Sequence, residues 1–158
     1  MTHGSDSEVK VSRQENAEEP AWPPTLTPYI AVSDGRRALD WYAAVLGAQL
    51  RGDIYVMPDG SIGHAEIALG NAVLMVSEGS SEVPVRAPEG DMHSHSLHLQ
   101  VVDVDTVTAR AAKHGAAVER EPTDEPYGRV SVVVDPFGHR WMFNTPPEGA
   151  GNPAETPR

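Results

Sequence analysis

The chain contains one pattern twice, and this repeat constrains its fold more than any other feature. Residues 30–48 and residues 99–116 each begin with a short apolar alternation that ends in aspartate. Each segment continues into a helix-like stretch and closes on Gly-Ala before another apolar run. Two such copies, about seventy residues apart, predict two similar structural units. Because two copies of one unit usually share a cavity at their junction, we expect a functional site there.

Composition narrows the class of protein. The 158 residues carry a formal net charge of -11 and contain no cysteine. No stretch arrays Lys and Arg as phosphate binding requires, which argues against nucleic acid and against an anionic membrane as partners. No apolar run approaches the roughly 20 residues of a membrane span. The absence of cysteine excludes disulfides and thiolate metal sites, and we expect a cytoplasmic protein.

The sequence predicts one folded domain between two tails. Residues 1–24 are rich in Ser, Glu, Asn and Pro and poor in aliphatic side chains, which predicts a disordered N-terminal arm. Residues 146–158 predict a disordered C-terminal tail in the same way. The domain between them consists of a first module, a linker rich in Ser, Pro and Gly, and a second module: 25–145, divided into 25–78, 79–94 and 95–145.

Hydrophobic periodicity predicts the same order of elements in both modules. The first module has a strand, a helix and three strands: 25–33, 36–46, 49–56, 63–69 and 72–77. The second has the same order: 96–102, 105–113, 117–121, 128–134 and 140–144. Asp34 and Asp103 are placed to cap the two helices, and Gly47 to end the first. Because three strands follow each helix with no further helical pattern, an antiparallel meander is favoured over a parallel α/β fold.

Four groups of residues carry a resemblance to a known family. They are Thr27–Val32 with Asp34, Ala38, Trp41, Tyr42, Leu46 and Gly47; His64–Ile67; Ser96–Leu99 with Val101, Asp103 and Asp105; and Asp135–Trp141. Together they resemble the vicinal oxygen chelate superfamily of glyoxalase I, bleomycin-resistance proteins and extradiol dioxygenases, in particular its PhnB-like branch. The resemblance implies an α+β fold in which two tandem β-α-β-β-β modules form curved mixed sheets around a cavity.

The resemblance also implies where a divalent metal would bind. Metal-dependent members take a His, Glu or Gln ligand from the first and fourth strands of each module. In this chain those four positions fall on Thr27, Met75, Ser96 and Met142. Hydroxyl groups are weak neutral donors and thioethers suit soft ions, so none of the four is a usual ligand for such a metal. We therefore predict no metal and no other cofactor at the usual site.

Strand alternation predicts which side chains line the cavity instead. One set is apolar and would pack under the helices: Ile30, Val32, Leu97, Leu99, Trp141 and Phe143. The alternate set is mixed, and we predict that it binds a ligand: Tyr29, Met75, Ser96, His98, Gln100, Met142 and Asn144. Such a face suits a flat, partly aromatic organic molecule. Plain packing remains an equal alternative for Met75 and Met142.

The histidines offer a second interpretation. His64 and Glu66 share a strand face, and with His98 they have the chemistry of a displaced metal site. Otherwise, His98 hydrogen-bonds a ligand or Tyr29, or acts as a general base that Glu66 orients. His139 is more typical of a structural residue, and spacing alone does not decide between these roles for His98.

Two classes of function follow. The first is a metal-independent binding protein for a small organic molecule, which forms a homodimer with cavities completed across subunits. The second is a lyase, isomerase or dioxygenase that holds Zn, Mn, Ni or Fe on His64, Glu66 and His98. A metal-free acid–base enzyme that uses His98 and Glu66 stays open as a third. We favour the binding protein because all four usual ligands are missing.

Overall fold

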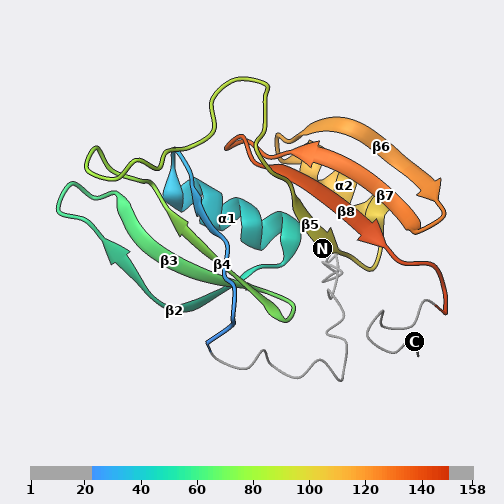
Figure 1. Ribbon diagram of the computed structural model, residues 1–158, viewed down its shortest axis with the longest axis horizontal. Coiled ribbons are helices and arrows are strands. Elements are labelled where there is room, and N and C mark those ends of the chain that lie inside the picture. The colour runs from blue at the N-terminus through green and yellow to red at the C-terminus, as the bar shows by residue number, and fades with distance from the viewer. Residues whose placement is uncertain (1–22, 150–158) are drawn as a thin grey trace, which may run out of the picture.

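The computed structural model describes residues 23–149 and contains two sheets side by side, each with a helix on one face (Figure 1). The first module consists of β1 (Tyr29–Ala31), α1 (Gly35–Leu46), β2 (Gln49–Val56), β3 (Ile62–Leu69) and β4 (Ala72–Ser77). The second consists of β5 (Leu97–Gln100), α2 (Val104–Lys113), β6 (Ala117–Glu125), β7 (Gly128–Val134) and β8 (Arg140–Thr145). Residues 1–22 and 150–158, which hold most of the predicted arm and tail, lie outside the described residues.

Both helices begin at the predicted aspartates. Asp34 Oδ1 accepts a hydrogen bond from the backbone N–H of Arg37 at 3.1 Å, and Asp103 Oδ1 does the same for Thr106 at 3.1 Å. Each bond satisfies one of the amides that a helix leaves open at its first turn. Gly47 ends α1 in the left-handed region at φ 68°, where glycine costs least. The two helices therefore begin one residue earlier than predicted and end where predicted.

The two sheets share one mixed topology. In the first sheet the strand order is β1-β4-β3-β2, with β1 parallel to β4 and the other pairs antiparallel. In the second sheet the order β5-β8-β7-β6 repeats this arrangement. Each module is therefore an antiparallel three-strand meander with its first strand added parallel to its last, which confirms the predicted fold class.

Strand ends are where the prediction fails. Residues 25–28 and 32–33 lie outside β1, because β1 pairs with β4 at three residues only and its last ladder bond runs from Val32 N to Ser77 O. The predicted strand 117–121 instead continues to Glu125, past Pro122. That strand is β6, at the edge of its sheet, where a missing N–H removes no ladder bond. Register shifts in its pairing with β7 absorb the irregularity.

One hydrophobic core joins both modules. The apolar stripe of α1 is buried at Trp41, Tyr42, Val45 and Leu46, whereas Leu39 is half-buried. These side chains belong to the same cluster as residues of the second module, among them Val104, Trp141 and Phe143. The predicted apolar set of strand residues lies on this side in both sheets. Side chains at alternate strand positions therefore point to the opposite face, which we call the open face of each sheet.

A buried carboxylate fixes the two modules to each other. Asp135 accepts hydrogen bonds from the Tyr42 hydroxyl at 2.7 Å, from the Trp141 ring N–H at 2.9 Å, and from two backbone amides in its own turn. His139, predicted to be structural, is buried with Nε2 2.8 Å from the carbonyl oxygen of Ala31 in β1. We call these residues (Ala31, Tyr42, Asp135, His139 and Trp141) the Asp135 junction. Burial and the charge of Asp135 raise the pKa of Tyr42 far above its usual range, so the phenol keeps its proton.

Helix and turn contacts, not strand pairing, connect the modules. The Trp41 ring N–H donates to the carbonyl of His114, and Arg110 Nε donates to that of Val45, both at 2.9 Å. Within residues 23–149, no strand of one sheet is hydrogen-bonded to a strand of the other. Neither helix of this described part has the length and apolar character of a membrane span.

Candidate functional site

The open face of the first sheet carries a row of side chains from all four strands. Tyr29 on β1 lies beside Met75 on β4, Met75 beside Glu66 on β3, and Glu66 beside Arg51 on β2. Tyr29 is 51% exposed, and Met75 is half-buried. The structure thus brings together two of the predicted ligand-binding residues, an aromatic ring and a thioether, with a carboxylate next to them.

A hydrogen-bonded chain runs across this face. The Tyr29 hydroxyl lies 2.7 Å from His64 Nδ1, and His64 Nε2 lies 3.2 Å from Glu66 Oε1. The rings of Tyr29 and His64 meet edge-to-face, with centroids 5.4 Å apart. The three residues form what we call the Tyr29 chain. His64, not His98, is therefore the partner of both Tyr29 and Glu66, which corrects both sequence-based roles that joined His98 to them.

The open face of the second sheet repeats the arrangement with different chemistry. His98 on β5 lies beside Met142 on β8, at the positions that Tyr29 and Met75 hold in the first sheet. His98 and Gln100 are exposed, and within the described residues the side chain of His98 makes no hydrogen bond. Asn144 departs from the prediction, because it is 4% exposed and its amide donates to the carbonyl of Tyr127 at 3.4 Å.

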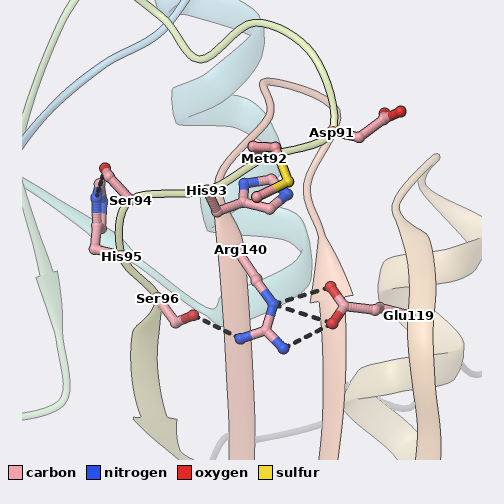
Figure 2. A pocket seen from close by; sticks show the side chains of 8 residues that line it. All are labelled: Asp91, Met92, His93, Ser94, His95, Ser96, Glu119 and Arg140. Atoms are coloured by element: carbon pink, nitrogen blue, oxygen red, sulfur yellow. Dashed lines mark hydrogen bonds and ion pairs between the residues drawn. The ribbon is translucent and has the colours of Figure 1, made fainter.

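A surface pocket of about 490 Å³ lies beside β5 (Figure 2). Residues 91–96 form one wall, including His93 and His95, and the floor carries Arg140 and Glu119. Arg140 donates to Ser96 Oγ at 2.6 Å and, through Nε and Nη2, to both oxygens of Glu119 at 2.7 to 3.2 Å. The hydrogen bond from Arg140 holds the pKa of Glu119 below its usual range. The Arg140 guanidinium therefore already forms an ion pair with Glu119 and a hydrogen bond with Ser96.

The four positions where the family resemblance implies metal ligands do not fit a divalent metal. Met75 and Met142 offer thioethers beside Tyr29 and His98, Ser96 is bonded to Arg140, and Thr27 is half-buried ahead of β1. Hydroxyl and thioether groups are poor donors for Zn, Mn, Ni or Fe. The donor set therefore gives no basis for chemistry at such an ion.

The displaced metal site is not assembled within one chain. His64 and Glu66 are adjacent on the first sheet, but His98 lies on the second sheet. Among residues 23–149, no three His, Asp or Glu side chains gather in a group able to hold a metal ion. The pattern His-x-Glu on one strand was a correct signal that these two side chains meet, but it did not identify Tyr29 as their third partner.

The ion pairs of Arg129 and Arg140 were not predicted from the sequence. Arg129 pairs with Asp105 of α2 at 2.6 Å and with Asp124 at 2.9 Å, so it is held against its own module. Arg140 on β8 pairs with Glu119 on β6, across the intervening strand β7. No sequence spacing signals these three pairs, because each joins residues from different elements.

The paired β-α-β-β-β modules agree with the protein family that the chain matches. A family model described as the glyoxalase/bleomycin resistance protein/dioxygenase superfamily matches residues 24–143. The chain belongs to this superfamily, as the four groups of residues that resemble it indicated.

Individual relatives agree with this assignment. An uncharacterised protein of Mycobacterium bovis is 34% identical over 131 residues, which cover 78% of this chain and 84% of the relative. The crystal structure of TnmS3, described as an antibiotic binding protein from a Streptomyces species, is 27% identical with a TM-score of 0.56, over 76% of this chain and 93% of that one. A PhnB protein of Bacillus cereus shares the fold at 15% identity, with a TM-score of 0.62, over 77% of this chain and 98% of that one.

Proposed function

We propose that this protein binds a small, flat, partly aromatic organic molecule at the open face of its first sheet. The observation that carries the proposal is the half-exposed ring of Tyr29 beside the thioether of Met75, on the face opposite the core. Aromatic rings and thioethers both make favourable contacts with a flat ring system. The neighbouring carboxylate and imidazole supply the few polar groups that orient a ligand in such sites.

Binding proceeds without a divalent metal in this proposal. Its support is the donor chemistry at Thr27, Met75, Ser96 and Met142, which suits packing against a ligand better than coordination. TnmS3, at 27% identity, is described as an antibiotic binding protein, and this supports a binding role for the present chain.

A second copy of the chain completes the site in this proposal. Tyr29 and Tyr55 are large exposed side chains on the first sheet, with Tyr55 paired to His64 of the open face, and exposed apolar area of this kind favours a partner. The second sheet presents His98 and Met142 at the equivalent positions of its own open face. A homodimer in which the first sheet of one copy faces the second sheet of the other would enclose a ligand between Tyr29 and the partner's Met142.

Titration calorimetry with 2-naphthol as a flat aromatic probe tests the binding proposal. We expect Tyr29→Ala to weaken binding about tenfold, since a ring contact contributes about 0.5–1.5 kcal/mol beyond area burial. Leu50→Ala is the matched control, because Leu50 is as exposed as Tyr29 but pairs with the core-facing Ile67. Equal effects of the two variants, or no binding by the wild type, would overturn the proposal.

Two further measurements separate the alternatives. Dialysis against EDTA should leave 2-naphthol binding unchanged, whereas a stoichiometric transition metal in the purified protein would favour the metal-dependent enzyme. Mixing Tyr29→Ala with Met142→Ala should create tight sites that neither variant has alone, because one site of the mixed dimer then carries neither substitution. A mixture no better than its components would contradict the shared site. Conversion of the probe by metal-free protein would favour an acid–base enzyme.

A further inference from the structure

We infer that Tyr29 meets its ligand as a hydrogen-bond acceptor, so that the site selects molecules with an O–H or N–H group at this point. The inference rests on the proposed function and deepens it, because it assigns the chemistry of one ligand group. It follows from the order of donors and acceptors in the Tyr29 chain, beginning at its carboxylate.

Glu66 decides which ring nitrogen of His64 carries the proton. An ionised carboxylate only accepts hydrogen bonds, and a neutral imidazole has one N–H and one lone pair. His64 Nε2 lies 3.2 Å from Glu66 Oε1, so this nitrogen must be the donor. The lone pair then sits on Nδ1, which lies 2.7 Å from the Tyr29 hydroxyl. Tyr29 must therefore donate its proton to His64.

With the His64 proton on Nδ1 instead of Nε2, neither the Nε2 lone pair nor the Tyr29 hydroxyl proton has a good partner. A proton on Nδ1 would turn the Nε2 lone pair toward the carboxylate oxygen at 3.2 Å, and like-signed groups repel at that distance. The Tyr29 proton would then have only the carbonyl of Gly63 as an acceptor among the described residues, at 3.4 Å. Hydroxyl hydrogen bonds are typically 2.5 to 3.0 Å long, so this contact is weak. Only the first order satisfies every member of the chain.

The position of Tyr29 makes this direction of hydrogen bonding relevant to a ligand. Its side chain starts from β1 and reaches His64 on β3, so it crosses over β4, which lies between them. The residue is 51% exposed there, beside Met75. A phenol oxygen that has given its only proton to His64 presents lone pairs alone to whatever lies above the sheet. A ligand O–H or N–H satisfies that oxygen, whereas a carbonyl or ether oxygen does not.

Nitrogen NMR of the histidine rings tests the proton order without any ligand. In mildly alkaline buffer, where imidazoles are neutral, we expect His64 to be the Nε2–H tautomer, with its signals assigned by their loss in His64→Gln. His139 is an internal reference, because its Nε2 faces the carbonyl of Ala31 and must donate. Glu66→Gln should give a mixture of both tautomers, since an amide offers a donor as well as an acceptor.

A pair of probes tests the consequence for binding. We expect 2-naphthol to bind about two- to tenfold more tightly than 2-methoxynaphthalene, the range that one net hydrogen bond supplies. Tyr29→Phe should bring the two affinities together. An Nδ1–H tautomer in the wild type, an unchanged tautomer in Glu66→Gln, or equal probe affinities would overturn the inference. Failure of both probes to bind, with the Nε2–H tautomer present, would contradict the proposed function while the proton order stands.

Discussion

The Asp135 junction and the Tyr29 chain share three kinds of side chain but lie in opposite surroundings. Each contains a tyrosine, a histidine and a carboxylate. In the junction the carboxylate is 4% exposed and receives four hydrogen bonds. In the Tyr29 chain the side chains of His64 and Glu66 are 36% and 21% exposed, and each hydrogen bond is a single contact in a line.

The difference shows how surroundings assign a role to a polar cluster. No buried side-chain polar atom in the described residues lacks a hydrogen-bond partner, so the junction has no capacity left for a ligand. Its contacts join α1 to the turn before β8, and its contribution is to stability. The Tyr29 chain joins β1 to β3, which are both already paired with β4 through their backbones, and Tyr29 remains half-exposed. Loss of the junction should therefore reduce stability, and loss of the chain should reduce binding.

The largest expected effect is a loss of stability when the carboxylate of Asp135 is removed, compared with removal of the carboxylate of Glu66. Asp135→Ala leaves the Tyr42 hydroxyl and the Trp141 ring N–H buried without an acceptor. Each such group costs about 1–3 kcal/mol, so we expect a loss of about 3 kcal/mol or more in the free energy of unfolding, measured by urea denaturation. Glu66→Ala should cost below about 0.5 kcal/mol, as surface substitutions usually do.

Asp135→Asn provides a second measurement if the alanine variant does not fold. It keeps one acceptor oxygen, yet its amide N–H groups face donors, so its loss should still exceed that of Glu66→Gln. Equal losses for the two amide variants would show that burial does not distinguish the clusters.

The next largest effect compares the two tyrosines by their contribution to stability, which for Tyr42 also depends on pH. Tyr42→Phe should lower the free energy of unfolding by about 1–3 kcal/mol, the range for a buried hydrogen bond to a charged group, whereas Tyr29→Phe should change it little. The pKa of Tyr42 is raised in the folded state, chiefly by burial and then by Asp135, so the unfolded chain loses this proton first as pH rises. Stability from Tyr42 is thus complete below about pH 10 and declines above it.

Urea denaturation at a series of alkaline pH values measures this decline. The slope should become shallower in Tyr42→Phe than in the wild type. A slope equal to that of the wild type would assign the alkaline loss to other groups and remove Tyr42 from the explanation.

Much of the scaffold could be predicted from local pattern. The aspartate caps, the left-handed Gly47 and the alternation of core-facing residues depend on near neighbours in the chain, and the structure confirms them. The family resemblance also implied equivalent positions for Met75 and Met142 in the two modules, and the strand register shows the equivalence directly.

The partners within the candidate site could not be predicted in this way. Alternation assigns a side chain to a face but does not say which strands lie next to each other. The sequence offered His98 as one hydrogen-bond partner for Tyr29, with a ligand as the alternative for His98, yet the order β1-β4-β3 places His64 within reach of Tyr29. Asn144 shares a face with Met142 but is buried, because it lies near the end of β8 against the β6–β7 turn. The order of strands in a sheet and the burial of a residue by neighbouring segments are tertiary properties, and strand periodicity predicts neither.

The smallest expected effect concerns Glu119, whose side chain is more exposed than the carboxylate of either cluster. The hydrogen bond from Arg140 lowers the pKa of Glu119 in the folded state, so the pair contributes stability above the ordinary glutamate value and loses it as pH falls. Because the Glu119 side chain is 46% exposed, solvent screening limits the contribution to about 0.5 kcal/mol or less. Glu119→Gln should therefore lower the free energy of unfolding slightly at neutral pH and not at acid pH. Glu121→Gln, on the same strand and exposed, is the matched control. A loss in Glu119→Gln that persists at acid pH would mean that packing, and not the ion pair, holds Arg140 in place.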